Sequence, residues 1–280
     1  MNYPVGVSYR LLPLLLVLSA MSEPASAVGL LGSAAEFAVL GANTVSNNGA
    51  TSIYGNLGVA SNTAITGLGT ITQVGTVHAG DAIAALASLD AARAATALSA
   101  LPFDTDLTGQ DLGSLGPLAP GIYRFASAAQ LTGTLMLDYT GNSRKPFIFQ
   151  IGSTLTTASN ASVEVIGGDA RSGLFWIVGS AATLGTGTRL AGNIIAATSI
   201  TLNIGVDILC GRAIALGGTV TLDSNRVSND CSGTGDLGSG RVDFGSGGFD
   251  GAVPEPASWA LLIIGLGLTG TMLRRARAIA

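Results

Sequence analysis

The sequence predicts a mainly β protein, a β-helix (β-solenoid) of short stacked strands with one long α-helix packed alongside. Three observations lead to this prediction. The 280 residues include 40 glycines but only 11% charged and 5% aromatic residues, a composition that favours many tight turns. A Thr-Leu pair recurs at intervals of 20, 29, 18 and 20 residues, and a period near 20 is typical of β-helical coils. A single Ala-rich segment without Gly or Pro interrupts the pattern and favours a helix.

The N-terminal residues 1–27 are typical of a secretory signal peptide. Arg10 precedes an apolar run over residues 11–20, and Ala25, Ser26 and Ala27 form a small-residue cleavage site. The run is shorter than the ~20 residues that a membrane-spanning helix needs, so we expect export and removal by signal peptidase rather than an anchor.

The repeats predict a domain over residues 28–228. The Thr-Leu pairs begin at Thr134, Thr154, Thr183, Thr201 and Thr221, and four of them are followed by apolar strands at 147–151, 174–178, 193–197 and 212–216. Such coils bury their inward side chains only when neighbours stack above and below. The N-terminal part repeats more loosely: residues 43–45 (Asn-Thr-Val) are echoed after 19 residues by 62–64 (Asn-Thr-Ala). Residues 55–57 hold the place in their repeat that 192–194 and 211–213 hold in theirs, so we expect N-terminal coils in the same stack.

The Ala-rich segment predicts a helix over about residues 80–101, ended by Pro102. Ile83, Leu86 and Leu89 recur at helical spacing, and we expect this apolar stripe to pack against a sheet. The single histidine, His78, lies just before the helix, where a structural role at the helix entrance is expected rather than catalysis.

The C-terminal part is typical of a linker followed by a sorting signal. Residues 229–252 are mostly Gly, Ser and Asp and predict a flexible linker. Pro254, Glu255 and Pro256 then precede an apolar stretch over 259–273 that is closed by an Arg cluster including Arg274 and Arg275. This order resembles the PEP-CTERM sorting signal of Gram-negative bacteria over 253–280. The resemblance implies transient membrane insertion and processing by an exosortase-type enzyme; a plain C-terminal anchor is the alternative. Both place the domain at the cell surface or outside the cell.

Cys210 and Cys231 are the only cysteines, and in an exported chain they are expected to form a disulfide. Closing so short a loop stabilises by roughly 3 kcal/mol in the chain-entropy model. A metal site would need further ligands, and His78 is far away in sequence.

Little in the chain points to catalysis or to nucleic acid. Without the two terminal segments, nine basic and fifteen acidic residues leave a net charge of −6, and no basic patch appears that would bind phosphates. The carboxylates of the repeats, Asp138, Glu164, Asp169, Asp207 and Asp223, occupy different phases, so stacking does not pair them. We therefore expect no catalytic residue, cofactor or metal. An enzyme remains the third alternative and would need a cleft with two close carboxylates.

Strand alternation predicts a surface function instead. If the Leu of each pair faces inward, the Thr faces outward, and Thr154, Thr183, Thr201 and Thr221 form one file. Neighbouring coils lie ~4.8 Å apart and outward residues along a strand ~6.7 Å apart, so hydroxyl and methyl groups form a grid. Thr is also simply a good β-former, which is the plainer explanation. The candidate surface residues are Thr154, Thr156, Thr183, Ser199, Thr201, Asn203, Thr219 and Thr221.

Residues 31–67 and 121–228 resemble the bacterial and fungal ice-binding-protein-like family. The likeness lies in the segments 37–41 (FAVLG), 55–59 (GNLGV), 121–123 (GIY), 147–152 (FIFQIG) and 211–213 (GRA). It implies a right-handed, three-faced β-helix with one helix alongside and with N-terminal coils stacked beside C-terminal ones. It also implies Thr-x-Thr rows on an ice-binding face, which Thr154 with Thr156, Thr186 with Thr188, and Thr219 with Thr221 match. We expect a monomer that adsorbs to ice crystals; a structural or adhesive protein of the extracellular matrix is the alternative.

Overall fold

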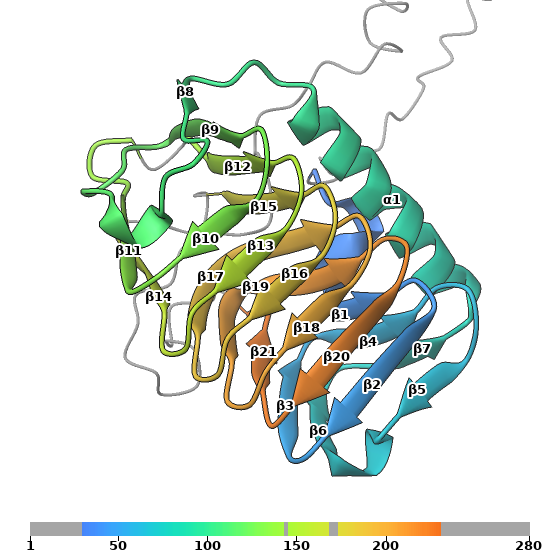
Figure 1. Cartoon of the computed structure of the whole chain (residues 1–280). Coiled ribbons are helices and arrows are strands. Elements are labelled where there is room, and N and C mark those ends of the chain that lie inside the picture. The colour runs from blue at the N-terminus through green and yellow to red at the C-terminus, as the bar shows by residue number, and fades with distance from the viewer. Residues whose placement is uncertain (1–29, 143–144, 168–172, 231–280) are drawn as a thin grey trace, which may run out of the picture.

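The structure, a computed structural model, describes residues 30–142, 145–167 and 173–230, which form two parallel β-sheets and one α-helix. In Figure 1 the strands lie side by side in successive coils, with the helix α1 (Ala82–Ser99) along one side. The smaller sheet contains β2 (Thr44–Asn48), β5 (Ala64–Thr66), β10 (Ala129–Leu131), β13 (Leu155–Thr157), β16 (Ala182–Leu184), β18 (Ile200–Leu202) and β20 (Thr219–Asp223).

The larger sheet has 14 strands. They are β1 (Phe37–Gly41), β3 (Thr51–Tyr54), β4 (Asn56–Val59), β6 (Ile71–Val74), β7 (Val77–Ala79), β8 (Thr105–Asp106), β9 (Gly121–Phe125), β11 (Thr134–Asp138), β12 (Phe147–Ile151), β14 (Ser162–Ile166), β15 (Leu174–Val178), β17 (Arg189–Ala196), β19 (Asp207–Ala215) and β21 (Arg226–Ser228). The apolar strands predicted from the repeats are β12, β15, β17 and β19, which pair in that order, so this prediction is confirmed.

N-terminal coils stack on C-terminal ones, as expected. β1 pairs with β19, β2 with β20 and β3 with β21, all in parallel. Two copies of the repeated corner lie on top of one another, since their first glycines, Gly192 and Gly211, approach closely. Gly192 has a φ of +88°, and a Cβ on Gly211 would clash with the carbonyl oxygen of Gly192. Glycine is required here because the backbones of adjacent coils come too close for a side chain.

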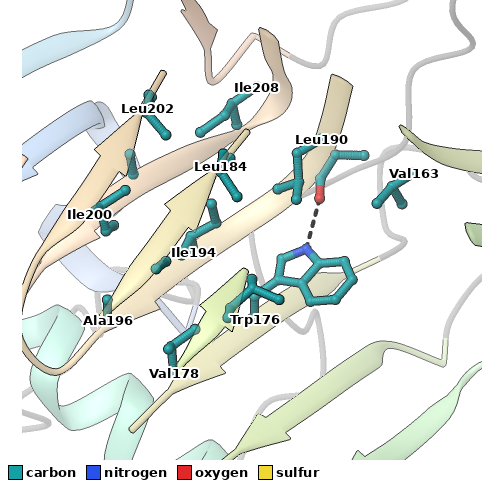
Figure 2. Close-up of a cluster of buried hydrophobic side chains, with 14 of the residues drawn as sticks. Val163, Trp176, Val178, Leu184, Leu190, Ile194, Ala196, Ile200, Leu202 and Ile208 are labelled. Atoms are coloured by element: carbon teal, nitrogen blue, oxygen red, sulfur yellow. Dashed lines mark hydrogen bonds between the residues drawn. The ribbon is translucent and has the colours of Figure 1, made fainter. Parts of the chain in front are cut away.

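The inside of the coils is filled by stacked apolar side chains. Figure 2 shows Trp176 among aliphatic neighbours, with its Nε1 donating a hydrogen bond to the carbonyl oxygen of Ala191 at 2.9 Å. The ring of Phe149 stacks on Trp176 with centroids 4.2 Å apart, and Tyr123 stacks on Phe149 at 5.4 Å. This inner stack fixes the coils one above another and makes the outer surfaces rigid.

The helix packs through a different face from the one predicted. Ile83, Leu86 and Leu89 are 53%, 49% and 57% exposed, so the predicted stripe is wrong. The buried face consists of Ala84, Ala87, Ala91, Ala94, Ala95 and Leu98, within a cluster that includes Phe37 and Ile148. Small alanine side chains let the helix axis approach the already apolar sheet closely, which long side chains would prevent.

The entrance of α1 is held by the pair His78 and Asp81. His78 is buried, its Nδ1 lies 2.7 Å from Asp81 Oδ2, and its ring lies 5.4 Å from that of Phe37. Asp81 is the N-cap and accepts a hydrogen bond from the backbone N–H of Ala84 at 2.8 Å. The backbone N–H of Ala84 and the bond to His78 lower the pKa of the Asp81 carboxyl. The structural role expected for His78 is confirmed.

The two ends of the domain in sequence are tied together. The Ala35 carbonyl oxygen accepts hydrogen bonds from Arg212 Nη2 at 2.6 Å and from Asn229 Nδ2 at 3.1 Å. The folded domain therefore includes Asn229, which the sequence alone assigns to the linker. Cys210 is buried on β19 and is not a free thiol. Its expected partner Cys231 lies outside the described residues, so the pairing stays a prediction.

Candidate functional site

The outward surface of the smaller sheet carries the predicted threonines. Its strands alternate strictly: Leu155 is buried, Thr156 is exposed and Thr157 is buried, and β10, β16 and β18 follow the same alternation. Inward residues fill the core, so the outward ones form the surface.

One straight file of residues crosses all seven strands of this sheet. The pairing register aligns its members residue by residue, in the spatial order Gln130, Thr156, Thr183, Thr201, Thr221, Ser46 and Thr66. We call these seven residues the central file. Six of the seven carry a hydroxyl group, at the regular ~4.8 Å spacing of neighbouring strands.

Thr154 does not belong to the central file, contrary to the prediction from the Thr-Leu pairs. Leu155 pairs with Ala182 rather than with Leu184, so Thr156 takes the place expected for Thr154. In this coil the inward position next to Leu184 is filled by the buried Thr157. Its hydroxyl lies 2.7 Å from that of Thr188 and accepts the N–H of Gly185 at 2.9 Å, which satisfies a polar group inside the core.

The same contact removes one of the expected Thr-x-Thr rows. Thr188 is fully buried, so it does not form a surface row with Thr186. The rows of Thr154 with Thr156 and of Thr219 with Thr221 do lie on the surface of the smaller sheet.

Two shorter files flank the central one. Thr154, Ala181, Ser199, Thr219, Thr44 and Ala64 lie two residues before it, and Thr132, Ala158, Gly185, Asn203, Asp223 and Asn48 lie two residues after it. All eight candidate residues named from the sequence therefore lie on this one surface. We call the central file with its two flanking files the hydroxyl face.

The hydroxyls at the middle of this face are available to solvent. Thr156, Thr183 and Thr201 have no side-chain hydrogen bond to any other described residue. Further along, Ser46 Oγ donates to Thr221 Oγ1 at a long 3.4 Å. Because the hydroxyls of Thr156, Thr183 and Thr201 are not used in such bonds, they can bind water.

The hydroxyl face is also almost free of charge. Asp223 is the only ionisable residue in its three files, and its carboxylate accepts a 3.3 Å hydrogen bond from Asn48 Nδ2. On the larger sheet, by contrast, one outward file runs through Arg189, Asp207 and Arg226. A neutral, hydroxylated surface is unsuited to ionic ligands and suited to ordered water.

Sequence reasoning missed the N-terminal part of this face, namely Thr44, Ser46 and Thr66, and also Gln130. The echo at 19 residues pointed to this region but was one residue out of register, since Thr44 pairs with Ala64 rather than with Thr63. A 20-residue spacing, as between Thr201 and Thr221, would have aligned it correctly.

The pairing register does not bring the carboxylates of the repeats together. In the register Asp138 pairs with Ile166, Glu164 with Met136 and Asp207 with Arg226; Asp169 lies outside the described residues. No group of three potential metal ligands occurs within residues 30–142, 145–167 and 173–230. Two open hollows, of about 520 and 500 Å³, lie beside the C-terminal half of α1. Their linings contain no Asp, Glu, His or Cys.

Parallel coils, a helix alongside and a neutral hydroxyl face define a rigid β scaffold that presents an ordered polar surface. A family model described as ice-binding-like matches residues 39–228, and a model of the PEP-CTERM protein-sorting motif matches residues 252–277. The chain belongs to the ice-binding-like family, and the resemblance drawn from its motifs is confirmed.

Similar proteins carry the same description. An ice-binding protein of Nostoc sp. (strain HG1) is 46% identical over 248 residues, which cover 89% of this chain and 87% of that protein. The crystal structure of an ice-binding protein from the Antarctic ascomycete Antarctomyces psychrotrophicus matches with a TM-score of 0.66 and 37% identity, covering 71% of this chain and 98% of that one. A second, from an Antarctic biological consortium, matches with a TM-score of 0.67 and 32% identity over 81% of this chain and 96% of that one.

Proposed function

We propose that this chain is an exported protein that binds ice through the hydroxyl face. The central file carries the proposal, because a regular row of outward-facing hydroxyls repeats across six of the seven strands. The names of the relatives support ice as the ligand and do not favour the alternative of a matrix or adhesive protein.

In the proposed mechanism the protein orders water molecules and catalyses no reaction. Each outward hydroxyl anchors a water molecule, and the threonine methyl groups beside it restrict the positions that further waters take. Because the packed core fixes the spacing between the strands, the anchored waters hold a fixed lattice that can merge with an ice surface. Binding of this kind uses no cofactor, metal or catalytic residue.

The residues proposed to contact ice include the eight named from the sequence. Thr156, Thr183, Thr201 and Thr221 form the centre of the contact, and Thr154, Ser199, Thr219 and Asn203 its margins. The register adds Ser46 and Thr66, which extend the contact onto the N-terminal coils.

The remainder of the chain is proposed to deliver the domain. Residues 1–27 act as a signal peptide, and the tail from residue 253 acts as the sorting signal, with Pro254, Glu255, Pro256, Arg274 and Arg275 as its recognition elements. The tail inserts transiently in the membrane and is processed by an exosortase-type enzyme. We further propose that the coils wind as a right-handed, three-faced β-helix and that Cys210 pairs with Cys231.

The test is thermal hysteresis and inhibition of ice recrystallisation, measured on residues 28–252. The match to the crystallised ascomycete relative covers 71% of this chain and 98% of the relative's chain. The relative therefore folds with little more than the part that corresponds to this domain. Growth arrest and fine-grained ice at micromolar protein support the proposal. Unaltered ice growth at a hundredfold higher concentration overturns it.

A further inference from the structure

The two ends of the stack of coils differ in how their strand edges are covered. At one end the connection after α1 folds over the last coil. Its strand β8 pairs with β9, and its backbone forms isolated β-bridges between Asp111 and Gln130 and between Leu118 and Leu137. Leu107 and Leu112 of this connection are buried in the core of the coils. The end is closed, because its outermost strand has only two residues and carries the acidic Asp106.

At the other end the last coil consists of β5, β6 and β7, seen at the lower end of the stack in Figure 1. Among the described residues each of these strands is paired on one side only, β5 with β2, β6 with β3 and β7 with β4. In a parallel ladder alternate residues turn their N–H and C=O groups away from the neighbouring strand. These three outer edges therefore offer unpaired backbone groups to another β edge.

The side chains of this open coil do nothing to protect its edges. Residues 61–80 contain no Lys, Arg, Asp or Glu, although exposed edges and terminal repeats in natural proteins usually carry charges. Val74 is 60% exposed. The apolar side chains that the coil leaves wholly or partly uncovered are Ile65, Leu68, Ile71, Val74 and Val77.

We propose that the open coil is an interface through which two copies of this chain associate head to head. A partner that binds this coil needs an unpaired β edge and a neutral apolar surface. The open coil of a second copy has both. The chain as a whole carries a net charge of −4, so two copies repel over most of their surfaces, but the coil of residues 61–80 adds nothing to that repulsion.

The closed end sets the stoichiometry. Head-to-tail contact would build a filament, but the covered end offers no edge for it, so association stops at a two-fold dimer. Under this symmetry β5 runs antiparallel to β5 of the second copy. This proposal differs from the monomer expected from the sequence, and it does not depend on ice binding.

The test is sedimentation equilibrium of residues 28–252 from about 1 to 500 µM, a range that covers weak association through small interfaces. We expect a reversible monomer–dimer equilibrium that Val74→Lys weakens by at least about tenfold, since it places two like charges in the contact. The matched control is Leu89→Lys, at the similarly exposed apolar position on α1 (57%), and it should leave the equilibrium unchanged. A monomer throughout, or a dimer that Val74→Lys and Leu89→Lys affect equally, overturns the proposal.

Amide hydrogen exchange on the unmodified domain tests the same interface without a variant. Protection of residues 64–77 that rises with protein concentration supports the dimer. Amides that point toward β2 and β3 are protected at every concentration, so the test concerns the amides that point away from them. Protection of these outward amides that does not change with concentration means that another part of the same chain covers the edge. That result, or concentration-dependent protection elsewhere only, overturns the proposal.

Discussion

Replacing Thr201 with Tyr tests the hydroxyl face at its centre. Thr201 lies on β18, the fourth of the seven strands, with three strands on either side. Six intervals of ~4.8 Å make the intact file about 29 Å long. The phenol ring of a tyrosine at position 201 stands above the hydroxyls and divides the file in two. The longest uninterrupted part of the file then spans three strands, or about 10 Å, which is roughly a third of the intact length.

We therefore expect Thr201→Tyr to lower thermal hysteresis to about a third or less of the wild-type value at equal concentration. The side chain points outward, and Tyr is a good β-former, so folding stability should change by less than about 1 kcal/mol. The matched control is Thr134→Tyr, an exposed outward position on β11 of the larger sheet. The reasoning is refuted if Thr201→Tyr keeps full hysteresis while folded, or if Thr134→Tyr loses as much.

Three further predictions concern stability and pH. Trp176→Ala should destabilise the domain by roughly 3–5 kcal/mol in chemical denaturation, because it removes a large, fully buried side chain that stacks on Phe149; a loss below about 1 kcal/mol would contradict this packing. Ala91→Leu should cost about 1–3 kcal/mol by forcing α1 off the sheet, whereas Leu89→Ala should change stability by less than about 0.5 kcal/mol, and the reverse order would show that the predicted stripe packs after all. Ice activity should be constant between about pH 5 and 9, because hydroxyls do not titrate there, and denaturation midpoints should fall as the pH drops below about 4, where Asp81 and Asp111, whose folded pKa values are lowered, become protonated. A midpoint that rises on acidification would contradict the last prediction.

The sign of that pH effect follows from the contacts of Asp111. Burial by itself would raise the pKa of this carboxyl, but hydrogen bonds from Thr132 and from the backbone of Gly113 outweigh it, and the pKa is lowered. The carboxylate therefore stabilises the fold above its unfolded pKa and loses this contribution as the pH falls through its folded pKa.

Much of the fold followed from the sequence because its signals are local. The apolar strands from β12 to β19 come at the period of one coil, and the Ala-rich helix begins at a capping Asp81, so spacing and propensity were enough. The buried face of α1 did not follow, because hydropathy ranks Leu above Ala. Closeness of approach to a sheet that is already apolar decides the packing instead.

The sequence predicted which surface carries the candidate site, but it did not predict the strand register that decides which residues share a file. The Thr-Leu pairs selected the correct strands. In β13, however, the buried Thr157 takes the inward position that Leu184 holds in the next coil, so Thr156 and not Thr154 lies in the central file. A side chain's inward or outward direction in a strand depends on the neighbours that the strand pairs with, and a short repeat does not contain that information. The share of Ser46 and Thr66 in the face depends on pairing across about 175 residues, which only the folded chain reveals.

The central claim is that the hydroxyl face, and no other surface, adsorbs to ice. Its most direct test is a single ice crystal grown in a solution of fluorescently labelled residues 28–252, with Thr201→Tyr and Thr134→Tyr grown in parallel. The account predicts that the unmodified domain and Thr134→Tyr label defined planes of the crystal and that Thr201→Tyr labels them much more weakly. A crystal that stays dark with the unmodified domain, or one that Thr201→Tyr labels as brightly, would contradict it.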